Sequence, residues 1–181
     1  MKKIVTTAFI LSLTACASLS QDQCMNADWY QLGRSDGEKG YSSTRLSKHR
    51  KACAKHGLSP DTSDYSNGRK KGLLYYCTAD NGLSEGLKGK SYRRVCPLNL
   101  EKKFLAQYEV GKGIYNLEKE IKEHRRKISS IERNIKADKK KSKLSKAEIT
   151  DYKHDMEILE VRIEEKQKRL YHMKGQAGVS L

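Results

Sequence analysis

The stretch that decides the fold of the first half is Gly33-Arg34-Ser35-Asp36-Gly37-Glu38-Lys39-Gly40, which follows Trp29. Its glycines recur at intervals of three and four residues, a spacing that puts them on one face of an α-helix. Glycine in a helix interior costs roughly 0.5–1 kcal/mol relative to alanine, so glycines gathered on one face require a compensating contact. The spacing therefore predicts that a second backbone approaches this helix closely, with the leading aromatic ring beside the groove.

The same arrangement recurs along the chain. Gly82, Gly86 and Gly89 repeat the spacing of the first three glycines. An aromatic residue also precedes further glycines: Tyr65 comes before Gly68 and Gly72, and Tyr108 before Gly111. The alternative is that some glycines mark caps and turns, and Gly57 and Asn81-Gly82 fit that role better. We predict short helices over about 26–40, 44–56, 60–79 and 83–91, the third with Ser59 as cap and Pro60 in its first turn.

The composition changes near Pro97, and residues 101–174 contain neither proline nor cysteine. Apolar residues there step by three and four, as in a coiled coil. One seam runs through Ile114, Leu117, Ile121, His124, Ile128, Ile131 and Ile135, and a second through Ile149, Tyr152, Met156, Leu159, Ile163, Lys166, Leu170 and Met173. Ser145 and Glu148 form a capping box between them. The pattern predicts an antiparallel hairpin whose first helix, about 98–136, is on the order of 55 Å long.

Each hairpin helix is marginal alone, because its apolar stripe needs a partner. A single hairpin leaves part of each apolar stripe exposed to solvent. We therefore predict that the hairpin either oligomerises or docks against another protein. His124 on the first seam is interpreted as a polar register marker, and Lys166 on the second as a residue whose stem packs while its ammonium reaches water.

The N-terminus predicts export. Lys2 and Lys3 precede an apolar run over residues 4–13, which is too short to span a bilayer of roughly 30 Å. Leu13-Thr14-Ala15-Cys16 resembles a bacterial lipobox. We therefore expect residues 1–15 to be a lipoprotein signal peptide and Cys16 to carry the acyl anchor. Ala17 resembles the sorting signal for the outer membrane, which predicts a lipid-anchored protein there that faces the periplasm.

Without Cys16 the chain has four cysteines, Cys24, Cys53, Cys77 and Cys96, an even number that suits an oxidising compartment. They allow three pairings. We favour Cys24–Cys53 and Cys77–Cys96, because neighbouring pairs close short loops. The predicted organisation is then a linker over 16–25, a glycine- and tyrosine-rich helical domain over 26–100, the hairpin over 101–174 and a flexible tail over 175–181.

The chain is strongly basic. Its formal charge is +15, and +13 without Lys2 and Lys3. In the envelope we do not expect nucleic acid as the partner. The expected partners are lipopolysaccharide phosphates, anionic lipid or acidic protein segments. Candidate anion-binding residues are Lys136, Lys139, Lys140, Lys141, Lys143 and Lys146 in the hairpin connection, and Arg69, Lys70 and Lys71 in the first half. The alternative is a solvated loop that keeps the protein soluble.

The aromatic, glycine and cysteine motifs between Asp28 and Gly111 resemble, in order and spacing, a family of small proteobacterial lipoproteins whose shared domain has no known function. The resemblance covers about residues 28–113. It implies that Cys77 and Cys96 belong together, and that Cys24, Cys53 and the hairpin are additions. The family has no established activity, so the resemblance implies no catalytic residues.

No catalytic constellation is evident in the sequence, and we expect no cofactor. His49, Cys53 and His56 share a helical face suited to zinc, but a disulfide at Cys53 would remove the thiolate, so we predict no metal site. Carboxylates for glycan hydrolysis exist at Asp28, Asp36, Glu38, Asp61 and Asp64, although acids near helix starts usually serve the helix dipole.

Three hypotheses follow, in order of preference. The first is a non-enzymatic envelope lipoprotein whose hairpin mediates assembly with itself or with another envelope protein. The second is a binding module for an anionic envelope polymer, lipopolysaccharide or peptidoglycan. The third is an uncharacterised hydrolase.

Overall fold

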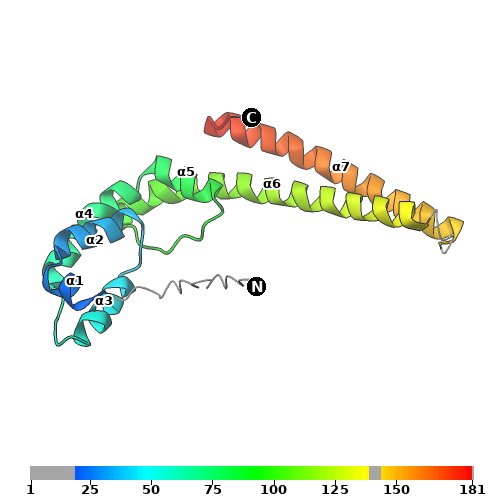
Figure 1. Cartoon of the computed structure of the whole chain (residues 1–181). Helices are drawn as coiled ribbons and strands as arrows, with labels where there is room; N and C mark the ends of the chain where they lie inside the picture. The colour runs from blue at the N-terminus through cyan, green and yellow to red at the C-terminus, as the bar shows by residue number, and fades with distance from the viewer. Residues whose placement is uncertain (1–18, 139–143, 181) are drawn as a thin grey trace, which may run out of the picture.

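The computed structural model describes residues 19–138 and 144–180, and over these ranges the chain is helical, with no strand. Five short helices come first: α1 Gln21–Met25, α2 Trp29–Glu38, α3 Thr44–Ala54, α4 Thr62–Tyr76 and α5 Ala79–Leu87. Two long helices follow, α6 Leu98–Asp138 and α7 Lys146–Ala177. Helix α6 leaves the group of short helices and α7 returns along it (Figure 1). The prediction of an all-α chain with a disulfide-linked helical half and a long antiparallel hairpin is confirmed.

Helices α2 and α4 are in contact through their backbones. A Cβ on Gly33 would overlap the carbonyl oxygen of Tyr65, and a Cβ on Gly68 would overlap that of Tyr30. Gly37 and Gly72 continue the same crossing one turn further on. Close packing along both backbones offsets the helix propensity that the glycines lose.

Helices α5 and α6 repeat this contact. Gly82 and Gly86 of α5 lie on the carbonyl oxygens of Phe104 and Tyr108, and Gly111 of α6 lies on that of Leu83. The prediction that the glycine faces mark close helix crossings is therefore confirmed in both places.

The two helix pairs also share their finer details. The first helix of each pair is followed by a glycine with positive φ, Gly40 at +61° and Gly89 at +69°. One residue later, the carbonyl of Tyr41 accepts a hydrogen bond from Arg69 Nη2 at 2.8 Å. The carbonyl of Lys90, at the same place in the second pair, accepts one from the Tyr108 hydroxyl at 2.7 Å. The first half is thus a tandem repeat of one glycine-packed helix pair. We call residues 24–113 the base.

Each pair is fastened by one disulfide, as predicted. Cys24 bonds to Cys53 and Cys77 to Cys96, with Cα–Cα distances of 5.5 and 5.6 Å. In both cases the bond ties the segment before the first helix of the pair to the segment that connects its two helices. The two bonds therefore restrain both connections covalently, in a base too small to bury a large core.

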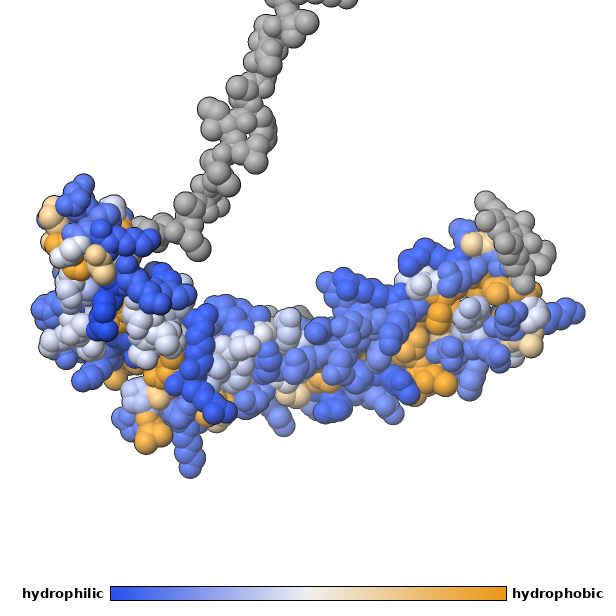
Figure 2. All heavy atoms as spheres, turned by 90° about the horizontal axis from the view of Figure 1, so that it is seen from below, coloured by the Kyte–Doolittle hydropathy of each residue, from blue (hydrophilic) through white to orange (hydrophobic). Residues whose placement is uncertain are grey.

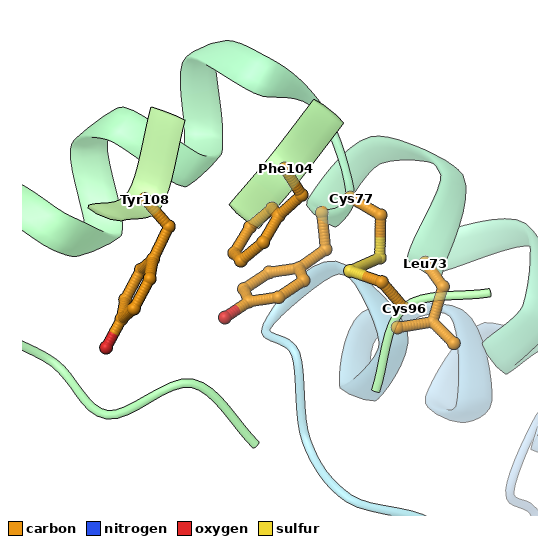
Figure 3. Packing of buried hydrophobic residues seen from close by; sticks show 6 residues of the cluster. Leu73, Cys77, Cys96, Phe104 and Tyr108 are labelled. Atoms are coloured by element: carbon orange, nitrogen blue, oxygen red, sulfur yellow. A yellow bond between two sulfur atoms is a disulfide. The ribbon is translucent and has the colours of Figure 1, made fainter. Parts of the chain in front are cut away.

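One aromatic cluster joins the two pairs. Its buried members are Leu73, Tyr76, Cys77, Cys96, Phe104 and Tyr108. Figure 3 shows the Cys77–Cys96 bond beside Leu73, with Phe104 and Tyr108 entering from α6. The rings of Tyr76 and Phe104 stack at 5.3 Å between centroids. Since α4 and α6 both contribute, this cluster fixes how the two pairs sit on each other.

The hairpin is built on the predicted seams. On α6, the seam residues closest to the base, Ile114, Leu117 and Ile121, are buried. On α7, Leu159 and Ile163 are buried, whereas Leu170 and Met173, which lie closer to the base, are half buried. Ser145 caps α7 with the predicted capping box, in which Glu148 returns the hydrogen bond. At about 1.5 Å per residue, the 41 residues of α6 extend about 60 Å. We call the part of the hairpin beyond Leu117 of α6 the arm.

Several boundaries differ from the predictions. Asp61 caps α4 instead of Ser59, and Pro60 lies outside the helix. Asn81-Gly82 is not a turn, because Thr78 caps α5 and Gly82 packs inside it. The expected domain boundary at residue 100 falls within α6, whose first turns pack on α5. Gly57 does follow a helix end with φ of +70°, as predicted.

Candidate interaction surface

The residues expected to contact other molecules lie far apart in the fold. Cys16, Lys139, Lys140, Lys141 and Lys143 lie outside the described residues, together with the expected signal peptide. Lys136 and Lys146 are exposed near the facing ends of α6 and α7, at the tip of the hairpin. The anchor and the lysine run therefore remain predictions.

The second predicted basic group lies on α4, in the base, at the opposite end of the molecule from the tip (Figure 1). Lys70 and Lys71 are exposed. Arg69 instead donates to the carbonyl oxygen of Tyr41 from Nε and Nη2, at 3.2 and 2.8 Å. Its guanidinium is part of the helix pair, and the structure does not combine Arg69–Lys71 with the lysine run into one site.

The carboxylates considered for hydrolysis have separate structural contacts. Asp28 and Asp61 accept backbone hydrogen bonds as the N-caps of α2 and α4. Glu38 pairs with Arg34 at 2.9 Å. Asp36 alone among the five is buried.

Asp36 is the centre of a buried polar cluster that sequence reasoning missed. Its Oδ2 accepts a hydrogen bond from the Tyr65 hydroxyl at 2.8 Å and lies 3.0 Å from His49 Nε2. Arg45 Nε approaches the same oxygen at 3.8 Å. Burial, and then the hydrogen bond to Asp36, raises the pKa of the Tyr65 phenol. The cluster holds α3 against the α2–α4 pair. The available signal was an acid amid glycines on one helical face.

Glu85 occupies the corresponding position in the second pair. It is 8% exposed and accepts hydrogen bonds from Lys88 and Lys90. Burial alone would raise the pKa of Glu85, but the hydrogen bonds and charges of the two lysines outweigh burial and lower it. Both pairs thus keep a buried acid next to the second glycine and change only its partners.

The proposed zinc ligands do not form a metal site. Cys53 is in a disulfide, and His49 contacts Asp36. Over residues 19–138 and 144–180 there is no group of three or more side chains arranged to hold a metal ion.

A groove of about 830 Å³ lies on one face of the arm. Ile121 and Leu170 form its apolar floor, and its wall on α6 carries Lys122, Arg125, Arg126 and Arg133, together with Glu118. None of the three arginines has a carboxylate within 4 Å among the described residues. We call this cavity the basic groove.

The opposite face of the arm has a shallower hollow, lined by Ile131, Ile158, Leu159 and polar neighbours. Ile158 is 37% exposed and the nearby Val161 52%. Figure 2 shows hydrophobic surface gathered toward the far end of the hairpin, among hydrophilic residues. Beyond Ile121, the seam residues Ile128, Ile131 and Ile135 are only half buried. The arm therefore has a thin core that its two helices do not cover.

His124 and Lys166 interrupt the seams, as expected, but have different surroundings. Lys166 pairs with Glu120 of α6 rather than only reaching for water, and Lys174 pairs with Glu118 at 2.9 Å. The Nδ1 atom of His124 is buried without a hydrogen-bond partner among the described residues. Burial and the charges of Lys166, Lys127 and Arg162 lower the pKa of His124.

The glycine pairs and the disulfide at Cys77 together define the part of the chain that has relatives. Residues 28–113 match a family model, DUF2799, which is described as a protein of unknown function. The DUF2799 match begins at the cap of α2 and ends just after Gly111, so it coincides with the two glycine-packed pairs. Cys24, α1 and the arm lie outside the matched residues, whereas Cys53, which was also expected to be an addition, lies within them.

No curated protein and no solved structure matches the chain. Over the described residues, no helix is both long enough and apolar enough to cross a bilayer.

Proposed function

We propose that this protein is a non-enzymatic envelope lipoprotein that uses the arm to assemble with other protein, while the DUF2799 base supports it. The observation that carries the proposal is the thin core of the arm. On α6 the seam residues beyond Ile121, namely Ile128, Ile131 and Ile135, are only half buried, and so are Leu170 and Met173 on α7. A partner that covers this stripe would remove apolar surface from water at roughly 25 cal/mol per Å².

The base supports this role by its rigidity. Two backbone-to-backbone helix crossings, two disulfides and a shared aromatic cluster restrain the start of α6. A stiff start lets a helix of about 60 Å hold its far end at a defined distance from the base.

Photo-crosslinking in cells tests the role of the arm. A photoreactive residue at Ser129, which is exposed and lines the basic groove, should capture protein, whereas one at Lys51, which is exposed on α3 of the base, should not. Absence of any crosslink both at Ser129, in the basic groove, and at Ile158, in the hollow, with the protein folded and at normal abundance, would contradict the proposal.

The membrane anchor is tested separately. Cys16→Ser should release the protein from membranes, and intact-mass analysis of the unchanged protein should show a lipidated residue 16 as the first residue. Persistent membrane attachment of the variant would exclude the acyl anchor without affecting the arm.

A second candidate function is binding of an anionic envelope polymer, lipopolysaccharide or peptidoglycan, through the tip. It is favoured by the exposed Lys136 and Lys146 beside the run of lysines between them. Replacement of Lys139, Lys140 and Lys141 by Gln should weaken retention on the polymer. The matched control replaces Lys48, Lys51 and Lys55, which are exposed on or next to α3. Equal retention of both variants and the unchanged protein would discard this function.

A further inference from the structure

Charge is divided between the two helices of the arm. Between Lys119 and Lys136, α6 carries seven basic and three acidic residues. Between Glu148 and Glu165, α7 carries seven acidic and two basic residues. These segments lie side by side and nearly balance, so the excess positive charge of the chain lies elsewhere.

Both kinds of charge lie on the face of the arm that holds the basic groove. The α6 wall of the groove carries three arginines, Lys122 and Glu118, while α7 contributes Gln167 and Leu170. Outside the groove lining, Glu160 and Glu164 precede Gln167 by seven and three residues, which places them on the same side of α7; both are exposed, and Glu164 pairs with Lys168 at 2.9 Å. This face of the arm therefore has a basic half on α6 and an acidic half on α7.

The division of charge decides which occupant suits the groove. A polyanion or an acidic helix would be attracted to the α6 half and repelled by the α7 half. An occupant that carries acidic residues opposite α6 and basic residues opposite α7 is attracted to both. A second arm, turned by 180° about an axis parallel to its helices, has this arrangement.

We propose that the arm pairs with the arm of a second copy of this chain, α6 of each copy lying against α7 of the other across the basic groove. This rests on the proposed role of the arm and names its partner. The result is a four-helix bundle in which the apolar floor, Ile121 and Leu170, is covered from both sides.

The register follows from contacts within one hairpin. Glu120 is level with Lys166, and Gly113 with Met173. The same antiparallel pairing places Arg125 and Arg126 level with Glu160. A two-fold axis along the helices preserves these levels, so the two arginines of one copy lie over the acidic stretch around Glu160 and Glu164 of the other. An axis across the helices would instead bring α6 onto α6, with like charges opposed.

The pairing also places both bases at the same end of the dimer. The described chain starts at residue 19, just before α1, and the Cys24–Cys53 bond ties α1 to α3 of the base (Figure 1). Two copies anchored through their N-termini can therefore sit in one membrane while their arms pair.

Charge reversal in two differently tagged, co-expressed full-length copies tests the proposal. Unchanged copies should co-purify. R125E/R126E should fail to pair with itself, because it sets Glu against Glu, and E160K/E164K should fail for the opposite reason. Each reversal should reduce the amount of co-purified partner by about tenfold or more. This reduction should be larger than the one that raised salt causes for the unchanged copies.

Co-expression of the two reversed variants with each other should restore pairing, since every contact is again between opposite charges. K102E/K103E, at exposed positions of α6 within the base, is the matched control and should pair normally. Circular dichroism should report equal helix content in all variants.

Two results would overturn the inference: unchanged copies that do not co-purify, or reversed variants that fold but do not recover when mixed. If pairing fails while a photoreactive residue at Ser129 still crosslinks to a different protein, the arm remains a contact surface and only its identification with a second copy is wrong.

Discussion

Gly68 of α4 lies directly on the carbonyl oxygen of Tyr30 in α2, so that no Cβ fits between them. The atoms in the way belong to backbone, which cannot rotate aside as a side chain can. The two helices touch here through their main chains, and the same holds for Gly82 and Phe104 in the second pair.

We predict that Gly68→Ala destabilises the protein by about 1–3 kcal/mol or more, because the added methyl group forces α2 and α4 apart. Urea unfolding, monitored by circular dichroism, measures this. Gly175→Ala is the matched control. Its Cβ would meet no atom within 4 Å, so the variant should be stabilised by up to about 1 kcal/mol through helix propensity. Equal effects of the two substitutions would refute the backbone contact.

Replacing Asp36 by Ala should cost more than replacing Glu85 by Ala. Loss of Asp36 leaves the buried Tyr65 hydroxyl and the His49 ring without their acceptor, at about 1–3 kcal/mol. The side chains of Lys88 and Lys90 are 55% and 57% exposed, so water can take the place of Glu85 as their hydrogen-bond acceptor. Replacing Glu85 should therefore lower the free energy of unfolding by less than about 1 kcal/mol. Thermal unfolding of both variants at pH 7 compares them, and an equal loss would show that burial of the acid, rather than its partners, sets the cost.

Each disulfide should stabilise the base by about 3 kcal/mol, since their loops span 29 and 19 residues. Cys77→Ala/Cys96→Ala should cost more than Cys24→Ala/Cys53→Ala, because the second bond is also part of the aromatic cluster. Denaturant midpoints of the two double variants give the order, and the reverse order would contradict the position of the cluster between the helix pairs.

The stability of the hairpin should fall as the pH is lowered through the ordinary pKa of histidine, near 6.5. The pKa of His124 is lowered in the folded state by burial and by Lys166, Lys127 and Arg162, with Glu120 opposing. The unfolded chain therefore binds a proton at His124 more readily than the folded chain does. The stability that the hairpin has at neutral pH is lost as the pH falls below the pKa of His124 in the unfolded chain. Melting temperatures at pH 7.5 and 5.5 measure the difference. His124→Leu should reduce it, and an unchanged pH dependence would exclude His124 as its source.

The local structure was largely predictable because it depends on neighbours in sequence. Steps of three and four predicted both hairpin seams, and the Ser145–Glu148 box predicted where α7 begins. Glycine spacing predicted close helix crossings. It misplaced Asn81-Gly82 as a turn, since the same residues suit a turn and a helix interior, and only the backbone of Phe104 lying on Gly82 distinguishes them.

The candidate site was less predictable, because it depends on residues distant in the chain. Arg69 looked like a free cation beside Lys70 until the fold placed the Tyr41 carbonyl next to it. Asp36, His49 and Tyr65 carry no shared local pattern, and they meet only because the α2–α4 crossing leaves room for α3. The sequence also shows that α6 is basic and α7 acidic, but it does not show that the arginines of α6 line a groove with Leu170 of α7.

By itself, then, the amino-acid order determined the helices, their caps, the favoured cysteine pairs and the two seams, since each of these reflects periodicity or short-range geometry. Tertiary structure alone decided which glycine face meets which backbone, how the aromatic cluster joins the two pairs, and that the arginines of α6 line one groove with Ile121 and Leu170. Those outcomes follow from packing and charge across distances that no local spacing encodes.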